Sequence, residues 1–506
     1  MTAPGGLALG EVGRLVAAGA TWMVGLRAVN RLIGLVSLTI LARLLLPQDF
    51  GLVAMAVAVA AFIDMFGQTQ VDVALIRDQT ADRSHYDSAW TLNILRGMVV
   101  AAILAACAHP VARFFSEPRL VDILYAVGAI QLVGSFVNIG VVDFRKDLHF
   151  RREFIYRLSS RVTGAVLTVA LALIWQNVWV LVAGMALRTV IAVILSYAMC
   201  RYRPRVSFAR FSQIFGFSKW VLVQSLFYEL REKTAVFVIG RMLNVEALGL
   251  FNLAREIGES VTTEFRAPMR RALFPGFAKM SAENGDLRTG FIEAFATMLI
   301  VSLPLSVGLY LVAPLVVEVL LGPRWSGALP LIEILALYGI VQSFGTSSHL
   351  VYNRIGRPRF TAAINVAHFI VFVPSVIWGV SAFGAEGAAW AITASAVIFL
   401  AADILIVRRV IGVGLRAFAA HVWRPVVAAG CMAAAVLSMR DGMPDAGNPL
   451  TALATLFALA VAGAAVYVAV DLALWAASRT ERGVERHIVG AVRRLLHACL
   501  PVRRSY

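Results

Sequence analysis

The sequence is poor in charged residues and in cysteine. Only 15% of its 506 residues are charged, whereas 59% are hydrophobic, and a soluble domain needs a very different balance. The four cysteines, Cys107, Cys200, Cys431 and Cys499, form no CxxC pair and show no spacing typical of metal ligands. These shortages argue against a soluble protein, a disulfide framework and a zinc site.

Sequence motifs of common catalytic sites are also missing. The eight histidines show no HExxH spacing, and the chain has neither a GxxxxGK phosphate loop nor a GxSxG nucleophile motif. The sizeable extramembrane domain or long external loop expected of a membrane glycosyltransferase or polymerase is not found either. We therefore expect a protein that is not an enzyme and that has no cofactor and no metal.

What the sequence does have is a series of apolar runs of about 20 residues, the length that crosses the hydrocarbon of a bilayer. Breaks at proline, glycine and charge clusters divide these runs into fourteen candidate transmembrane helices between residues 21 and 476. No small-residue cleavage site follows a short apolar region at the N-terminus, so we expect the first helix to be retained. The predicted fold class is an all-α polytopic membrane protein.

Positive charge is concentrated in the loops that follow every second predicted helix. These even-numbered loops hold 20 arginines and lysines, against 6 in the odd-numbered loops. The positive-inside rule then places the even-numbered loops and both termini in the cytoplasm. Membrane topology therefore explains the net charge of +16, and we expect no nucleic acid partner.

The first six and the next six predicted helices carry traces of an internal repeat. An ungapped offset of 198 residues places Arg43 on Arg241 and Gly51 on Gly249, with four further identities nearby. Because six is an even number, both copies enter the membrane from the same side, and parallel repeats of this kind usually enclose a substrate path. The alternative is a duplication that serves only packing.

The repeat predicts two six-helix bundles related by a pseudo-two-fold axis, followed by two extra helices.

In the tail, apolar residues recur at spacings of three and four between arginines, which is typical of a helix lying on an anionic membrane surface. A solvated, partly disordered tail is the alternative. The predicted parts are a cytoplasmic N-terminus (1–20), an N-lobe (21–200), a cytoplasmic linker (201–215), a C-lobe (216–410), helices 13 and 14 (421–476) and a basic amphipathic tail (477–506).

Several charged side chains fall inside the predicted transmembrane helices. Each costs roughly 2.5 to 3.5 kcal/mol at mid-membrane, so such a side chain usually faces a cavity or a partner. Arg27 and Arg31 lie four residues apart on one helix face, and the repeat places Arg31 opposite Glu229 in the second bundle. The bland alternative is that these charges form fixed pairs within one bundle or extend to the membrane interface.

Short motifs recur in order along residues 20 to 410. They include Ala74-Leu75-Ile76, Trp179-Val180-Leu181-Val182, Ile239-Gly240-Arg241, Ala247-Leu248-Gly249-Leu250-Phe251, Phe274-Pro275, Leu321-Gly322 with Trp325, and Gly356-Arg357-Pro358. Together they resemble the polysaccharide transporter family of the multidrug/oligosaccharidyl-lipid/polysaccharide exporter superfamily, which contains flippases for lipopolysaccharide and exopolysaccharide repeat units.

This resemblance implies a central cavity, alternating access, and a substrate of undecaprenyl-pyrophosphate-linked sugar repeat units in the bacterial inner membrane. It also implies membrane lipids, a polysaccharide polymerase and a chain-length regulator as partners. Coupling to Na⁺ or H⁺ is left open. Relatives often carry an acidic residue about one turn before the Ile-Gly-Arg motif, where this chain has Thr234 and Ala235, so no coupling carboxylate is carried over directly.

Three alternatives to a repeat-unit flippase stay open. They are a drug/cation antiporter of the same superfamily, a flippase for lipid-linked peptidoglycan precursors, and a non-transporting scaffold of a polysaccharide assembly complex. An antiporter would need a cavity of acids and aromatics, and a scaffold would need no buried charge.

Because cations suit a pyrophosphate, we predict that Arg27, Arg31, Lys233 and Arg255 bind the headgroup, and that Asp64, Glu229, Glu232 and Glu256 provide charge balance or cation coupling.

Overall fold

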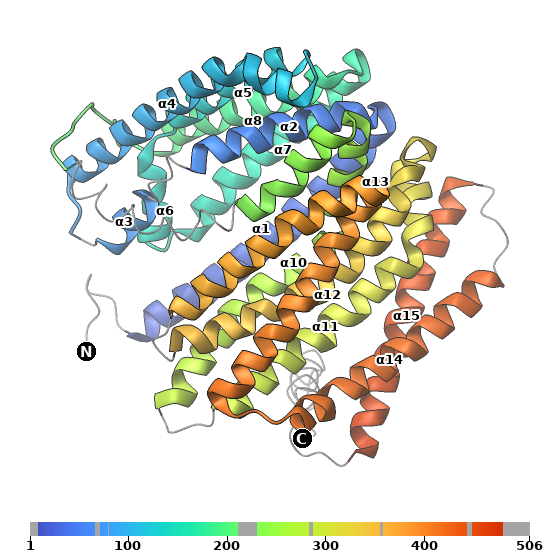
Figure 1. Cartoon of the computed structure of the whole chain (residues 1–506). Coiled ribbons are helices and arrows are strands. Elements are labelled where there is room, and N and C mark those ends of the chain that lie inside the picture. The colour runs from blue at the N-terminus through green and yellow to red at the C-terminus, as the bar shows by residue number, and fades with distance from the viewer. Residues whose placement is uncertain are drawn as a thin grey trace, which may run out of the picture. The chain divides into compact units, whose positions relative to one another are not determined.

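In the part that its computed structural model describes, the protein consists of helices, short connections and one extended segment after residue 199 (Figure 1). Contacts divide the chain into two compact units, Met1–Asn252 and Leu253–Tyr506. The lobe and linker boundaries that the sequence predicts stay predictions. The described residues are 9–65, 71–78, 80–210, 230–282, 287–354, 358–442 and 448–478.

The first unit, Met1–Asn252, is built from long apolar helices. Helices α4 and α5 pack side by side, as do α7 and α8, and α1 packs on α7. A helical segment at 230–242 also belongs to this unit. The long helices are α1 (Leu9–Leu44), α2 (Pro47–Met65), α4 (Arg83–Phe115), α5 (Leu120–Ser135), α7 (Phe150–Trp175) and α8 (Val178–Met199), and the short ones are α3 (Val71–Arg77), η1 (Ile139–Val142) and α6 (Asp143–Lys146).

Local capping residues explain where several of these helices begin and end. The Asp82 carboxylate accepts a hydrogen bond from the His85 backbone N–H at 3.2 Å, and the His85 ring accepts one from the Asp82 N–H at 3.3 Å. This reciprocal capping box satisfies two N–H groups that the first turn of α4 leaves open. Ser116, the C-terminal cap of α4, is in the left-handed region with a φ of 56°, and the Asn177 side chain caps the N-terminus of α8.

Two glycines that the sequence repeat aligns lie against each other's helix. A Cβ atom added to Gly51 would come within 1.9 Å of the Val245 carbonyl oxygen, and one added to Gly249 within 1.8 Å of the Pro47 carbonyl oxygen. Because Pro47 and Val245 are also 198 residues apart, the contact is reciprocal. The first turn of α2 therefore meets the first turn of α10 (Val245–Ala282) at a distance that only glycine allows.

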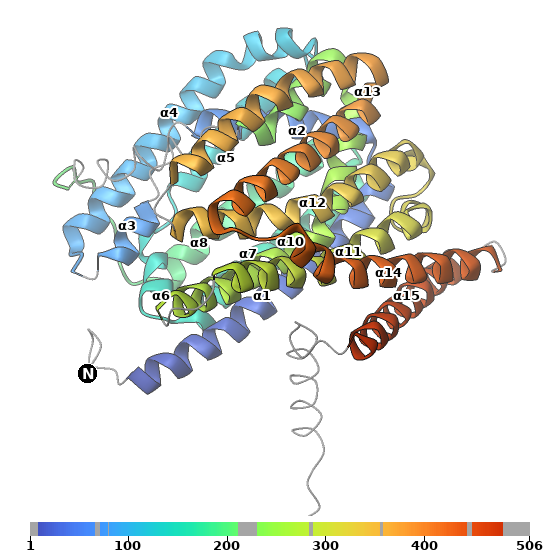
Figure 2. The same cartoon turned by 60° about the horizontal axis from the view of Figure 1, so that its bottom comes forward.

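The second unit, Leu253–Tyr506, contains most of α10 and the remaining helices. Helix α11 packs on α12 and α14, and α14 forms a hairpin with α15 (Figure 2). The Tyr467 hydroxyl of α15 donates a hydrogen bond to the Ile300 carbonyl of α11 at 2.9 Å. Its helices are α11 (Leu287–Val316), η2 (Val317–Leu321), η3 (Pro323–Ala328), α12 (Leu329–Arg354), α13 (Pro358–Ile411), α14 (Leu415–Asp441) and α15 (Pro449–Ala477).

The long α13 is two transmembrane helices that meet at a sharp kink. Phe383 and Gly384 leave the helical conformation there, and Gly384 has a φ of 62°. The two halves approach closely, since a Cβ atom on Gly379 would lie 2.4 Å from the Gly387 carbonyl oxygen. The sequence predicts a break between helices 11 and 12 at residues 381–384, and the kink confirms it.

The number of membrane spans agrees with the prediction from hydropathy. In the described part of the chain, ten helices are long and apolar enough to cross a membrane, or eleven if the bent pair Leu120–Ser135 and Ile139–Lys146 forms one span. Dividing α13 at its kink adds one, and the more polar α10 and the segment 230–242 add two. The total is fourteen, and the predicted all-α polytopic membrane fold is confirmed. The tail at 479–506 lies outside the described residues.

The reciprocal glycine contact makes a prediction about stability. Gly249→Ala places a methyl group against the Pro47 carbonyl, so we expect a loss of about 1 to 3 kcal/mol in the free energy of unfolding. Gly308→Ala in α11 is the matched control, because nothing lies within 4 Å of its Cβ position. Thermal unfolding of the purified protein in detergent measures both variants. Equal melting temperatures for the two would show that the close contact does not form.

Candidate anion-binding site

Glycines on α1 and α7 make room for arginine side chains on the neighbouring helices. The Nη2 atom of Arg161 on α7 lies 3.3 Å from the position of a Cβ atom on Gly34 of α1. The Cβ atom of Arg188 on α8 lies 2.9 Å from the corresponding position on Gly164 of α7. Both arginines are thus packed against adjacent helices within the membrane-spanning segments Phe150–Trp175 and Val178–Met199.

The two arginines predicted on α1 lie on the side of that helix that faces α7. Arg31 precedes Gly34 by three residues and Arg27 by seven, so all three share one helix face. Trp22, which precedes Arg27 on α1, contacts Phe154 of α7 with ring centroids 5.0 Å apart. Helices α1 and α7 therefore run side by side past Arg27 and Arg31.

Arg157, Arg161 and Arg188 form a positively charged group on α7 and α8, and Arg27 and Arg31 are counted with it from their positions on the adjoining face of α1. Arg157 and Arg161 lie four residues apart on α7, and both act electrostatically on Arg188. In the part of the chain that the structure describes, the one acidic partner of any member is Glu153, whose carboxylate lies 2.9 Å from Arg157 and 3.6 Å from Arg145. The arginine group, as named here, consists of Arg27, Arg31, Arg157, Arg161 and Arg188.

The arginine group has the chemistry of an anion site. Positive charges in transmembrane helices are costly without a counter-charge or water, and here they outnumber the described acid that pairs with them. A guanidinium group binds phosphate oxygens through two parallel hydrogen bonds. An anion with several charged oxygens, such as a diphosphate, would balance several of these arginines at once.

The sequence predicted Arg27 and Arg31 as ligands. It also showed Arg188 as a charge inside a predicted transmembrane helix, but Arg188 was not predicted as a ligand, and Arg157 and Arg161 were not considered. Arg157 and Arg161 have the same spacing of four that drew attention to Arg27 and Arg31. The same spacing rule, applied to residues 150–175, would have selected Arg157 and Arg161 as well. They lie near the start of a predicted helix, and only the packing of α7 against α1 shows where Arg161 lies.

Asp64, predicted to balance charge or couple a cation, is bound by an arginine of a neighbouring helix. Arg96 of α4 donates three hydrogen bonds of 2.6 to 2.9 Å to the Asp64 carboxylate of α2. This bidentate pair neutralises both charges locally.

Among the described residues, no group of three or more His, Cys, Asp or Glu side chains could hold a metal ion.

The predicted residues near the start of the second repeat are only partly described. Glu232 and Lys233 are half-buried in the helical segment 230–242, and the Glu232 carboxylate lies 3.5 Å from Arg231. Glu229 lies outside the described residues, so its pairing with Arg31 stays a prediction.

Arg255 and Glu256 belong to α10 in the second unit. The Arg255 Nε donates a hydrogen bond of 2.7 Å to Glu259, one turn further along the same helix. Glu256 is exposed. Arg255 therefore has an acidic partner within its own helix, unlike Arg161 and Arg188.

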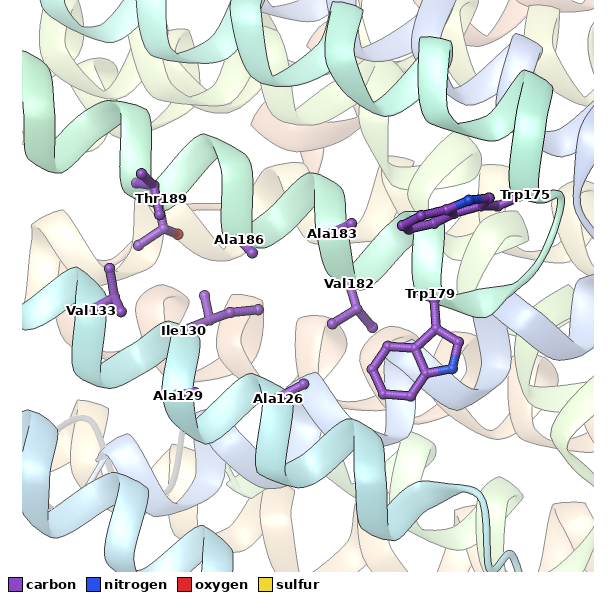
Figure 3. Close-up of a pocket in the computed structure, with 11 residues that line it drawn as sticks. Ala126, Ala129, Ile130, Val133, Trp175, Trp179, Val182, Ala183, Ala186 and Thr189 are labelled. Carbon is purple, nitrogen blue, oxygen red and sulfur yellow. The ribbon is translucent and has the colours of Figure 1, made fainter.

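An apolar groove of about 510 Å³ lies between α5 and α8. Figure 3 shows Trp175 and Trp179 at one end of the groove and Val133 and Thr189 at the other. Its α8 residues face α5, whereas Arg188 of the same helix lies against α7. The lining is almost wholly apolar, so the groove suits hydrocarbon and not an anion.

The Asp64–Arg96 pair gives a prediction that a double-mutant cycle can test. Asp64→Asn leaves the Arg96 charge without its partner, whereas adding Arg96→Gln removes that charge as well. We expect the double variant to be more stable than the sum of the two single effects by about 0.5 to 3 kcal/mol. Thermal unfolding in detergent gives the coupling, and strictly additive losses would rule out a stabilising pair.

Comparisons with known proteins agree with the polytopic fold. The model of one protein family, described as polysaccharide biosynthesis protein, matches residues 40–330. The lipopolysaccharide biosynthesis protein WzxC of Escherichia coli K12 is 22% identical over 412 residues, which cover 80% of this chain and 84% of WzxC. The succinoglycan biosynthesis transport protein ExoT of Rhizobium meliloti is 26% identical over 60% of this chain and 62% of its own length. The chain thus spans about three fifths of ExoT.

Two solved structures share the fold at low sequence identity. The lipid II flippase MurJ, in an inward closed conformation, superposes with a TM-score of 0.72 at 12% identity, over 90% of this chain and 99% of that structure. An inward-facing multidrug resistance MATE family transporter of the MOP superfamily gives a TM-score of 0.59 at 16% identity, over 76% and 94% of the two chains. The helices of this chain therefore follow the arrangement seen in these transporters.

Proposed function

We propose, because the chain belongs to the polysaccharide biosynthesis protein family, that it is a flippase for undecaprenyl-pyrophosphate-linked oligosaccharide repeat units. Relatives are named for lipopolysaccharide biosynthesis and succinoglycan transport, and the fold is that of a lipid II flippase. The arginine group carries the proposal, because a pyrophosphate linkage supplies the charged oxygens that these side chains require.

In the proposed cycle, the arginine group binds the pyrophosphate while the lipid tail stays in the bilayer. Excluding water strengthens the attraction between guanidinium and phosphate, and readmitting water on the other side weakens it. Alternating access therefore supplies both tight capture and release. Lys233 and Arg255 stay proposed as further headgroup ligands, and Asp64, Glu229, Glu232 and Glu256 as groups for charge balance or for coupling to a cation, Na⁺ or H⁺.

The protein is a multi-pass membrane protein, and we place it in the bacterial inner membrane with both termini in the cytoplasm. The excess of arginine and lysine in the even-numbered loops supports this orientation. A polysaccharide polymerase and a chain-length regulator are the partners that the pathway requires. The substrate crosses the membrane without chemical change, in keeping with relatives named as transport proteins.

A drug/cation antiporter is the second candidate, since the fold is shared with a MATE family transporter. The arginine group argues against it. Five arginines with one described acidic partner repel a cationic drug, whereas they attract an anionic headgroup. A lipid-linked peptidoglycan precursor contains the same pyrophosphate linkage, so the arginine group is equally compatible with it.

The anion site predicts a direct effect of Arg161→Gln. Losing one charge-assisted contact of about 1.5 to 3 kcal/mol should weaken pyrophosphate binding roughly 10-fold or more. Inorganic pyrophosphate should raise the melting temperature of the purified wild-type protein and raise that of the variant much less. Polysaccharide export should fall in parallel in a host that depends on this chain. Arg324→Gln, at an exposed position in η3, is the control, and equal responses of both variants would refute the site.

The loop charges predict the topology. Reporter domains fused after Tyr506 or inserted within residues 201–210 should read as cytoplasmic, and one inserted near Asp441 should read as periplasmic. An odd number of spans would place the two ends of the chain on opposite sides. Phosphatase and fluorescent-protein fusions measure each site, and the reverse pattern would overturn the orientation.

A further inference from the structure

An extended segment follows α8 and runs along the first turns of α4. We call residues 200–210 the strap. Its backbone N–H groups donate hydrogen bonds to polar side chains of α4, which replace the partner strand that an extended segment usually has. The bonds run from Arg205 to Asp87 at 2.8 Å, from Ser207 to Thr91 at 2.9 Å, and from Arg210 to Ser88 at 3.1 Å.

Tyr202 anchors the beginning of the strap. Its hydroxyl donates a hydrogen bond to the Asp87 carboxylate, and its carbonyl accepts one from the Asn138 side chain at 2.7 Å. Burial and the neighbouring Asp87 raise the pKa of Tyr202 above its usual range, so the phenol stays a donor at neutral pH. Arg203 is also engaged, donating to the Cys200 carbonyl at 2.6 Å. The strap is therefore fixed in place.

The fixed backbone presents a basic and apolar surface outward. Tyr202 is half-buried against α4, whereas Arg201 and Arg205 are exposed. Two large apolar side chains are also exposed, Val206 at 70% and Phe208 at 62%. Exposed apolar side chains next to exposed arginines are the combination that proteins present to the surface of a bilayer.

The strap advances along α4 between Arg205 and Ser207. Arg205 is bonded beside Asp87, and Val206 and Phe208 flank Ser207, which is bonded at Thr91. Thr91 lies about 12 Å along α4 from Arg83 at 1.5 Å per residue, inside the membrane-spanning segment. We therefore expect the arginines to lie at headgroup depth and the apolar pair to lie deeper.

We propose that the strap is a binding site for anionic membrane lipids, with Arg201 and Arg205 on the lipid phosphate and Val206 and Phe208 in the outer acyl layer. Charge complementarity selects anionic over zwitterionic lipid, because each arginine near a negatively charged surface contributes separately. The proposal goes beyond the transported substrate and does not depend on its identity. Because the strap is hydrogen-bonded to α4, the fraction of anionic lipid in the membrane would affect how firmly the strap holds α4.

Native mass spectrometry of the full-length protein in detergent tests the proposal with phosphatidylglycerol and phosphatidylcholine. The wild type should retain phosphatidylglycerol preferentially. Arg201→Gln with Arg205→Gln should raise its apparent Kd about fivefold for each arginine removed. Arg408→Gln with Arg409→Gln is the matched control, since these exposed arginines at the end of α13 carry the same charge. An unchanged Kd in the strap variant, or an equal rise in the control, overturns the proposal.

A depth measurement provides an independent test that does not depend on those arginines. A nitroxide label at Val206→Cys is introduced after Cys107, Cys431 and Cys499 are replaced by serine, while Cys200 is buried. In nanodiscs containing phosphatidylglycerol, the label should be more accessible to oxygen than to a water-soluble nickel chelate. Greater accessibility to the chelate shows a strap in water and refutes the proposal. An unchanged melting temperature confirms that the labelled protein is folded.

Discussion

The cost of charge and of open hydrogen bonds in hydrocarbon is the constraint on which this structure depends. Without water, each spanning segment must satisfy its own backbone, so the described elements are helices. The charged side chains of the membrane helices fall into three cases, which differ in how the charge is compensated. Asp64 and Arg96 pair between helices, Arg255 and Glu259 pair within one, and the arginine group retains excess charge. The third case needs either water or an anion to offset the charge.

Glycine decides where the helices approach each other and where they leave space. At Gly51 and Gly249, the missing side chains allow two helix termini to meet through their backbones. At Gly34 and Gly164, the space is occupied by the side chains of arginines from adjacent helices. Hydrocarbon gives no hydrophobic drive for helix association, so close packing at small residues supplies much of it. The same residue type thus fixes the fold and provides room for the candidate site.

Hydropathy and charge were enough to predict the fold but not the site. Long apolar runs are strong signals, and they predicted the fourteen spans and a break at residues 381–384, where α13 is kinked. Which side chains meet is decided by helix rotation and by the depth at which neighbours cross, and neither appears in a hydropathy pattern. The pairing of Asp64 with Arg96 was therefore not predicted, and Arg161 was not selected. Extended segments such as the strap have no periodicity, so their contacts with α4 could not be predicted.

The two faces of α8 suggest how one chain handles a substrate with two incompatible ends. Arg188 faces α7 and joins the arginine group, whereas Ala183 and Ala186 line the apolar groove toward α5. A lipid-linked oligosaccharide combines a pyrophosphate, which hydrocarbon excludes, with a polyisoprenoid, which water excludes. Binding both in one cavity would expose one of them to the wrong solvent. In the proposed function, the headgroup is therefore bound within the helices of the unit while the tail stays on their lipid side, so that only the polar end needs an alternating path.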